Sequence, residues 1–197
     1  QTIRIAPPLV IRKAELDGSG NVAWYAYDGA GQRVRKLWDK GAVKEERIYV
    51  GGYEVWRRRN GAGTVQEERQ TLHVMDDERR IAMAETLTRT GGAAVPAPTT
   101  RLRYQLDDHL GTALLEVDEA GAVITYEEYH PYGTTAWYAE KSAIQVSAKR
   151  YRYTGKERDE ETGLSYHGAR YYAPWLGRWT AADPAGMVDG LNRYAYV

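Results

Sequence analysis

One carboxylate near the end of the chain has neighbours that could support acid–base chemistry. Asp183 precedes Pro184 and follows a stretch rich in tyrosine and tryptophan, "YYAPWLGRW" at 171–179. A carboxyl group performs acid–base work when a partner acid or an adjacent cation sets its protonation state. An aspartate before a proline is also a common way to open a turn. The residues alone leave Asp183 between a turn residue and half of an acid–base pair.

The other residues that could do chemistry do not form a catalytic or metal-binding pattern. We expect no metal site and no cofactor, because the four histidines lack metal-ligand spacing: His73, His109, His130 and His167. Gly155-Lys156 lacks the preceding glycine-rich loop of a phosphate-binding loop. The acidic run at 159–161, Asp-Glu-Glu, is most simply a solvated turn.

Composition excludes several classes of function. The 197 residues carry 27 Lys plus Arg and 27 Asp plus Glu, so no net charge attracts nucleic acid or an anionic membrane. No apolar run is long enough to cross a membrane, and cysteine is absent. We therefore expect no nucleic-acid partner, no membrane insertion by this chain and no disulfide. Because Gln1 stands in place of a starting methionine, we expect a fragment, a processed product or the ordered part of a longer protein.

A four-residue pattern recurs along the chain, with an acidic residue first and a glycine fourth. It occurs at 17–20, 28–31, 108–111 and 118–121. Aspartate at the first turn position can bond its own backbone, and glycine at the fourth tolerates a positive φ. The pattern predicts hairpin turns with Gly31 and Gly121 at positive φ. Around 118–121 we expect Val117 to pair with Ala122, with Glu116 on the face opposite the apolar residues.

The segments between these turns predict strands. Alternating β-branched, aromatic and polar residues dominate, so the class is all-β and mostly antiparallel. Residues 74–87 contain the one plausible short helix, and strand–turn–strand is favoured there. Residues 88–100, with paired glycines and two prolines, predict a loop or linker. Residues 140–149 lack turn glycine and aromatics and predict an excursion from the sheet.

Aromatic usage divides the chain. It has sixteen Tyr, six Trp and no Phe, which suits broad sheets with one wet face because these rings have a polar tip. Four tyrosines precede the 88–100 segment and twelve follow it. We expect a β-segment at 1–87, a linker at 88–100 and a distinct, ring-rich unit at 101–197.

Four stretches resemble a known family. "YDGAGQRVRKL" at 27–37 resembles a YD repeat, and residues 151–197, with "GARYYAPWLGRWTAADPAG", resemble the Rhs repeat-associated core. "TLHVMDDERRIAMAET" and "RYQLDDHLGTALLEVDEAGAVITYEEYHPYGTT" are similar to the C component, or the fused B/C-like proteins, of insecticidal Tc toxin complexes. The chain is therefore identified as a member of the Rhs/YD-repeat family.

The resemblance implies a fold and a function. Members build part of a spiralling β-sheet shell, a hollow cocoon, from strand–turn–strand repeats, and the core domain curls inward as a plug. The shell houses a C-terminal toxic cargo and releases it by aspartic-protease-like self-cleavage. The implied partners are the remaining shell (same polypeptide or a B component), the cargo, and a pore-forming translocation subunit or a secretion needle. Secretion from a bacterium follows from the same resemblance.

The resemblance also implies site residues. The arginine of "GARYY" is Arg170 and the aspartate of "DPAG" is Asp183. The family's second aspartate and the scissile bond are expected beyond Val197, so this chain is expected to hold only part of the site. The carboxylates would share a proton and activate water, and the arginine would keep one of them ionised. Arg193 stands where the family pattern leads us to expect an aliphatic residue or tyrosine.

Nearby rings and two rival functions complete the expectations. Tyr171, Tyr172, Trp175 and Trp179 could keep the site dry, although plain core packing of the plug is the simpler role. One rival is a carbohydrate-binding β module that displays tyrosine and tryptophan on a sheet surface. A row of exposed rings would favour that module, and rings buried against a curved sheet with open edges would favour the shell. An independent toxin enzyme is disfavoured because no complete catalytic constellation is present.

Overall fold

The computed structural model of the chain describes residues 2–6, 10–16, 18, 20–77, 79–141, 146–188 and 190–196. These residues form seventeen strands and two short 3-10 turns, so the all-β expectation is confirmed. Within this part of the chain, no helix is long and apolar enough to cross a membrane.

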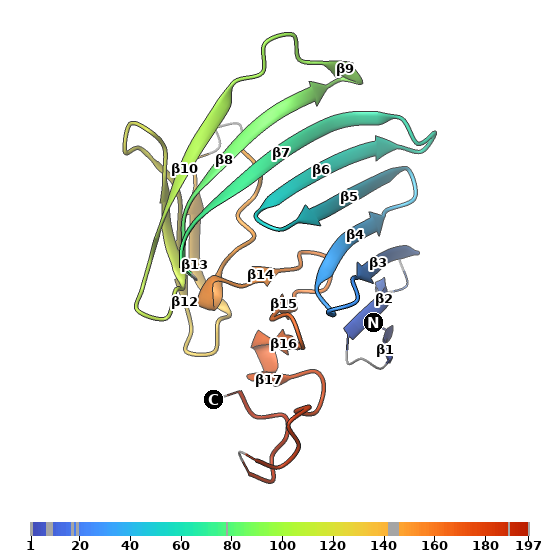
Figure 1. Ribbon diagram of the computed structural model, residues 1–197, viewed down its shortest axis with the longest axis vertical. Coiled ribbons are helices and arrows are strands. Elements are labelled where there is room, and N and C mark those ends of the chain that lie inside the picture. Colours follow the sequence, from blue (N-terminus) through green and yellow to red (C-terminus); the bar gives the residue numbers. More distant parts are fainter. Residues whose placement is uncertain are drawn as a thin grey trace.

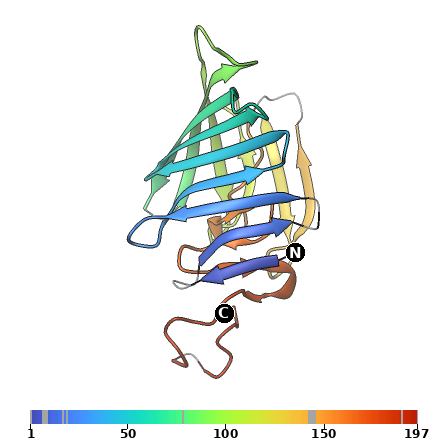
Figure 2. The ribbon, with the colours of Figure 1, turned by 90° about the vertical axis from the view of Figure 1, so that its right-hand side faces the viewer.

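Most strands belong to one large antiparallel sheet, which we call the wall. Its strands follow one another in chain order, and β9 alone branches off to pair with β8. The wall curves like a half-open shell, as Figures 1 and 2 show. Its strands are β1 (Thr2–Ala6), β2 (Val10–Leu16), β3 (Asn21–Tyr27), β4 (Arg33–Asp39), β5 (Val43–Val50), β6 (Tyr53–Asn60), β7 (Val65–Asp76), β8 (Arg79–Thr90), β9 (Ala93–Ala94), β10 (Thr100–Asp107), β11 (Ala113–Val117), β12 (Val123–Tyr129) and β13 (Thr135–Glu140).

The chain then turns back onto the concave side of the wall. Residues 146–179, which we call the inner layer, run along this side and form a small four-stranded sheet (Figure 1). Its elements are η1 (Tyr153–Gly155), β14 (Glu157–Arg158), β15 (Ser165–Tyr166), β16 (Tyr171–Ala173), η2 (Pro174–Leu176) and β17 (Arg178–Trp179). The family resemblance implied an inward-curling unit within 101–197; the part that curls inward is 146–179, whereas β10–β13 belong to the wall.

Repeated turns with one chemistry join the wall strands. Asp28, Asp108 and Asp118 each accept, at Oδ1, the backbone N–H groups two and four residues further on. Gly31 has a φ of 79° and Gly121 a φ of 76°, as predicted. Asp17 and Ser19, in the turn at 17–20, lie outside the described residues.

The predicted register at the 118–121 turn is wrong. Val117 pairs with Val123 instead of Ala122, and the register shifts at a bulge just before Val117. The cause is local: Gly121 N–H donates to Asp118 O, and Asp118 N–H donates to Ala122 O. A three-residue loop with a left-handed glycine leaves one extra residue on a strand, and this residue forms the bulge.

Glu116 lies on the face opposite Leu115, as expected, and that polar face is the buried one. Glu116 is 1% exposed and points to the concave side, where it accepts hydrogen bonds from Arg103 (2.6 Å) and Thr125 (2.8 Å). Tyr104 and Val123 lie half-exposed. At this hairpin the buried face of the wall therefore carries hydrogen-bonded charged and polar side chains, whereas the buried face of β2 and β3 is apolar.

Three segment predictions have clear outcomes. Residues 74–87 form strand–turn–strand, as favoured, because β7 ends at Asp76 and β8 begins at Arg79. The 88–100 segment is a hairpin tip, since β8 continues to Thr90 and pairs with β10, which begins at Thr100. The wall is continuous across it, and a domain boundary there stays a prediction. Of the expected excursion, residues 142–145 lie outside the described residues.

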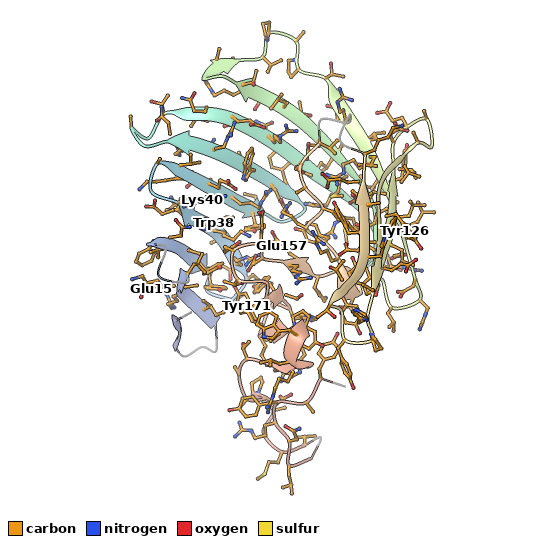
Figure 3. The ribbon with its side chains drawn as sticks, turned by 180° about the vertical axis from the view of Figure 1, so that it is seen from behind. Glu15, Trp38, Lys40, Tyr126, Glu157 and Tyr171 are labelled. Atoms are coloured by element: carbon orange, nitrogen blue, oxygen red, sulfur yellow. The ribbon has the colours of Figure 1, made fainter. Side chains whose placement is uncertain are left out.

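A compact apolar cluster fixes the inner layer to the first strands of the wall. It joins Ile11, Ala14, Leu16, Ala23 and Tyr25 of the wall to Leu164, Tyr171 and Ala173 of the inner layer. The tyrosines contribute polar tips as well as rings, since the hydroxyl groups of Tyr27 and Tyr171 lie 2.7 Å apart. Figure 3 shows Tyr171 and Glu157 between the two layers. This cluster sets the position of β16, which begins next to the candidate site.

Candidate functional site

The structure brings Arg170 and Asp183 together. Arg170 directly precedes β16, and Asp183 follows β17, the neighbouring antiparallel strand. Arg170 Nη2 lies 3.0 Å from Asp183 Oδ2, and the two side chains are 16% and 26% exposed. Because β16 and β17 are neighbouring antiparallel strands joined by a short connection, two residues thirteen positions apart in sequence form an ion pair.

Asp183 is a turn residue as well. Its Oδ1 accepts the N–H of Ala185 at 2.8 Å, and its carbonyl accepts the N–H of Gly186 at 3.1 Å. Its two carboxylate oxygens thus have different partners: Oδ1 accepts a hydrogen bond within the turn, and Oδ2 pairs with Arg170. The turn role of Asp183 is confirmed by these contacts, and its role in acid–base chemistry stays a prediction.

Arg193, the departure from the family pattern, packs against the same turn. Its Nη2 donates to Asp183 O at 3.0 Å, and Asp183 N–H donates to Arg193 O at 2.8 Å. The polar side chain therefore ties the C-terminal residues to the Asp183 turn through the backbone, in place of apolar packing.

Rings pack directly beneath the ion pair. The Arg170 guanidinium carbon lies 4.1 Å from the Trp179 ring centroid. Trp179 in turn contacts His167 at 4.9 Å and Tyr196 at 5.1 Å between ring centroids, and Tyr172 lies 4.1 Å from Tyr196. An aromatic floor of this kind fixes the plane of a guanidinium and lowers its exposure to water.

The expected ring set is only partly correct. Tyr172 and Trp179 belong to the floor, whereas Tyr171 packs in the apolar cluster and Trp175 is 51% exposed. The sequence analysis missed Tyr196, whose ring stacks on Tyr172. A tyrosine twenty-four residues after Tyr172 gives no local signal, because the intervening turns decide where it lies.

His167 is held neutral. Burial, with Lys156 and Arg170 nearby as cations, lowers its pKa to about 3. Its Nε2 is buried and has no hydrogen-bond partner among the described residues. A neutral imidazole beside Trp179 adds to the apolar floor and does not compete with Asp183 for Arg170.

The Arg170 guanidinium is incompletely paired. Its Nη1 is buried and has no hydrogen-bond partner in the part of the chain that the structure describes. Buried polar atoms in folded proteins are nearly always hydrogen-bonded, so an exception calls for an explanation. An arginine fork with one arm on a carboxylate and one arm free has room for a second anionic or carbonyl oxygen.

The charged run at 159–161 has a structural role that the sequence analysis got wrong. Asp159 is fully buried, where it lies 2.6 Å from Arg33 Nη1 and 2.8 Å from Lys36 Nζ. Glu161 accepts from Tyr25 at 2.8 Å and lies 3.2 Å from Lys36. Asp159 and Glu161 are buried, whereas Glu160 between them is exposed. The cations that pair with the two buried residues come from β4, more than 120 residues away, where no local pattern reveals them.

Glu157 occupies the centre of the same interface. It lies 2.6 Å from Arg33 and contacts Arg150 and Tyr49. Burial alone would raise the pKa of Glu157, but Arg150 and Arg33 outweigh burial and lower it. Further ion pairs line the concave face: Glu54 with Arg47 and Arg150, Glu85 with Arg69, and Glu127 with Lys149 and Arg152. We call this set of pairs the seam, and it positions the inner layer.

The described residues contain no group of three or more His, Asp or Glu side chains arranged to hold a metal ion. The chemistry available at Arg170–Asp183 is therefore that of a carboxylate, a permanently charged fork and a dry aromatic floor.

Comparisons with known proteins agree with this architecture. The chain is 40% identical over 193 residues to toxin subunit YenC2 of Yersinia entomophaga, covering 96% of this chain and 19% of the relative. It is 29% identical over 203 residues to toxin protein Tse5 of Pseudomonas aeruginosa, covering 91% of this chain and 15% of Tse5. No protein-family model matches the chain.

Solved structures share the fold. A crystal structure of TcdB2-TccC3 matches 100% of this chain and 10% of its own, with a TM-score of 0.84 and 34% identity. The Photorhabdus luminescens Tc holotoxin pore matches 99% of this chain and 9% of its own, with a TM-score of 0.83. The chain belongs to the Rhs/YD-repeat toxin family. It is similar within that family to the C components of Tc toxin complexes, and it spans about a fifth of the length of YenC2.

Proposed function

We propose that this chain is the C-terminal part of a toxin-encapsulating shell whose Arg170–Asp183 pair takes part in self-cleavage. The observation that carries the cleavage proposal is the pair itself, at 3.0 Å, with Arg170 Nη1 left free. The curved wall and the match to TcdB2-TccC3 over the whole chain support the encapsulating role.

In the proposed mechanism, a second aspartate from beyond Val197 binds beside Asp183. Two carboxylates at close range do not both ionise easily, so they share one proton. The ionised member takes a proton from water, which attacks the scissile carbonyl, and the protonated member donates to the leaving amine. Arg170 Nη2 keeps Asp183 aligned, and Nη1 donates a hydrogen bond to an oxygen of the incoming segment.

The proposed partners follow from the same arrangement. Strands β1 and β13 end the wall's strand order, so adjoining strands of the remaining shell would extend the sheet from either edge. The proposed cargo is the toxic segment that follows the cleaved bond. A translocation subunit or a secretion needle would deliver the assembled shell, and secretion from a bacterium is part of this proposal.

The carbohydrate-binding alternative receives less support. Tyr25, Tyr171 and Tyr172 are each at most 5% exposed, and they join the two layers or form the aromatic floor. Tyr126 and Trp137 form an exposed pair, with centroids 5.7 Å apart. The other exposed rings make no ring–ring contact among the described residues: Trp24, Tyr53, Tyr104, Tyr132, Trp175 and Tyr194. A single contacting pair is less than the row of rings that the alternative requires.

The cleavage proposal is tested in a polypeptide that continues beyond Val197. The unaltered protein is expected to be cut at one bond downstream of Val197. Asp183→Asn should abolish cleavage, because an amide neither shares the proton nor takes one from water. Arg170→Ala should slow it through loss of the orienting charge.

Asp118→Asn is the control. Like Asp183, Asp118 accepts the N–H two residues on with Oδ1 and the N–H three residues on with its carbonyl, but it has no arginine partner among the described residues. Intact-mass spectrometry of the four purified proteins gives the result. Cleavage of Asp183→Asn at the same bond and rate as Asp118→Asn would reduce Asp183 to a turn residue.

A further inference from the structure

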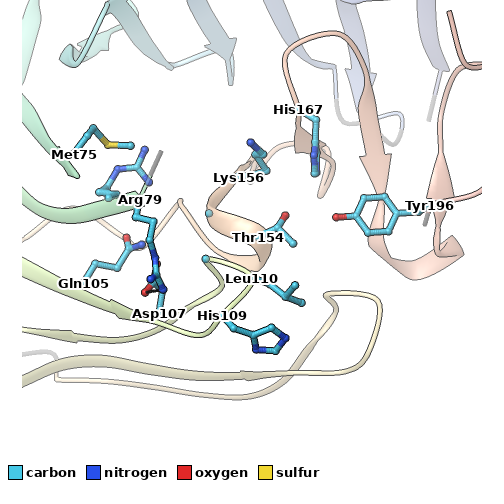
Figure 4. A pocket seen from close by; sticks show the side chains of 13 residues that line it. Met75, Arg79, Gln105, Asp107, His109, Leu110, Thr154, Lys156, His167 and Tyr196 are labelled. Carbon is cyan, nitrogen blue, oxygen red and sulfur yellow. Dashed lines mark hydrogen bonds and ion pairs between the residues drawn. The ribbon is translucent and has the colours of Figure 1, made fainter. Parts of the chain in front are cut away.

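A cavity of about 600 Å³ lies between the wall and the inner layer. Its wall side is formed where β7 ends and at β8 and β10, and its inner side by η1, the residue before β14, and Tyr196. Figure 4 shows Arg79, Gln105 and Asp107 across the opening from Lys156, Thr154 and Tyr196. This volume is within the range of small-ligand sites.

Two cations in the cavity lack a carboxylate partner. Arg80 Nε donates to His73 Nδ1 at 2.9 Å, and its guanidinium carbon lies 3.4 Å from the Tyr151 ring centroid. Among the described residues, no carboxylate lies within 4.0 Å of Arg80 or of Lys156. Asp107 also lines the cavity, but its carboxylate pairs with Arg79, at 2.7 Å from Nη2, and not with Arg80 or Lys156.

Arg80 differs in this respect from arginines of the seam. Arg33 and Arg150 each contact two carboxylates. Burial opposes the charge of Arg150, but Glu54 and Glu157 outweigh it and raise the pKa of Arg150. Burial is the largest influence on Arg80 and lowers its pKa. The site around Arg80 is therefore short of negative charge.

Gln105 gives an independent sign of an unfilled site. It is 7% exposed, it lines the cavity, and its Oε1 is buried without a hydrogen-bond partner in the described part of the chain. Buried amides normally have partners for both ends. Because Oε1 is an acceptor, a bare oxyanion does not satisfy it; the amide must turn so that its Nε2 donates to the ligand.

We propose that this cavity binds an oxyanion carrying at least two negative charges, with Arg80 and Lys156 as its charge partners. The shared chemistry is that of phosphate or paired carboxylate oxygens, which accept from guanidinium and ammonium donors. Two sources are compatible with it: a small free phosphate compound, or acidic side chains of a chain enclosed by the shell. The site is separate from Asp183 and does not require that the self-cleavage proposal be correct.

The test is calorimetric titration of the full-length polypeptide that carries residues 1–197. Pyrophosphate is one probe and a hexaglutamate peptide the other. Binding should weaken with added salt, because the charges are partly open to solvent. Arg80→Gln and Lys156→Gln should each weaken binding about tenfold, the usual loss for one charged hydrogen-bond partner. Arg101→Gln, which removes an exposed cation from β10, is the matched control and should bind unchanged.

The outcomes separate the two sources. Binding of pyrophosphate alone indicates a small free anion, and binding of the peptide identifies acidic side chains of an enclosed chain. Lys156 is exposed, so Lys156→Gln stays informative even if Arg80→Gln disturbs packing on Tyr151. The proposal is overturned if neither probe binds, or if Lys156→Gln binds as tightly as Arg101→Gln.

Discussion

Arginine–carboxylate pairs occur in two regions of this protein, and they differ in completeness. In the seam, both terminal nitrogens of Arg33 meet a carboxylate, Glu157 at 2.6 Å and Asp159 at 2.6 Å. At the candidate site, Arg170 meets Asp183 with one terminal nitrogen, and the other has no partner among the described residues. Arg33 Nε also lacks a partner there, so the contrast concerns the two terminal nitrogens. The pairs that use both terminal nitrogens hold two layers together. The incomplete pair, by contrast, has capacity for a partner, which is the property expected of half an active site.

The largest expected effect is on the seam. Arg33→Met leaves Asp159 and Glu157 buried with fewer cations, and breaking a buried pair typically costs about 3–5 kcal/mol. Hydrogen exchange of residues 146–179 measures the free energy of opening. Arg57→Met is the control, since Arg57 pairs with Glu68 on the wall at 2.7 Å and is partly exposed. Equal losses for the two variants would show that the seam does not hold the inner layer.

A steric test addresses the same contact between layers. Gly121 and Gly133 both have positive φ, but a Cβ on Gly121 meets nothing within 4 Å, whereas one on Gly133 meets Tyr153 at 2.5 Å. Gly121→Ala should cost about 1 kcal/mol through backbone strain. Gly133→Ala should cost about 2–4 kcal/mol, because η1 must also move. Chemical denaturation of both variants measures the difference, and equal costs would place η1 away from the β12–β13 turn.

The seam should also weaken in acid. The pKa of Glu157 is lowered in the folded protein. As the pH falls below about 4.5, Glu157 of the unfolded chain takes up a proton, whereas Glu157 of the folded protein stays ionised. Its contribution is thus fully present above pH 4.5 and is lost as pH falls toward the folded-state pKa. The pKa values of Glu54, Glu85 and Glu127 are lowered too, and that of Glu161 is raised.

Denaturation midpoints should therefore fall between about pH 5 and about pH 3. Glu157→Gln should be less stable at neutral pH and should show a flatter dependence over this range. A Glu157→Gln protein with the same slope as the unaltered one would contradict the assignment of Glu157 as a titrating member of the seam.

The smallest expected effect on stability is at the candidate site. Asp183→Asn retains an acceptor for Ala185 N–H, and it removes only a partly exposed ion pair. We expect a loss of about 1 kcal/mol or less. Denaturant midpoints compared with those of Arg33→Met give the contrast. A loss as large as that of Arg33→Met would assign Asp183 to the structural pairs.

Local chemistry in the sequence was sufficient to predict part of the fold. The Asp-x-x-Gly turns and their glycines follow from contacts within five residues. The strands between them show alternating polar and β-branched or aromatic residues. The bulge before Val117 was not predictable at that level, because the turn's hydrogen bonds decide which strand receives the extra residue. A register predicted from the alternation of side chains assumes that every residue of one strand has one partner on the next, and a bulge breaks this rule.

The candidate site was predictable only in part. Arg170 and Asp183 came from the family resemblance, and local spacing explains how a short β16–β17 connection joins them. The buried Asp159 could not be predicted, because a run of acidic residues is ordinarily solvated and its cations lie on β4. Tyr196 was missed for a similar reason, since distant turns set its place on the aromatic floor.

The most direct measurement of the central claim is a structure of the polypeptide extended beyond Val197, kept uncut by Asp183→Asn. The distance to measure joins Arg170 Nη1 to the nearest carboxylate oxygen downstream. Our account predicts that Nη1 donates a hydrogen bond of about 3 Å to a downstream aspartate. A structure in which no downstream carboxylate lies within about 6 Å of Nη1 would contradict it, because a cation farther away than this does little to keep a carboxylate ionised and aligned.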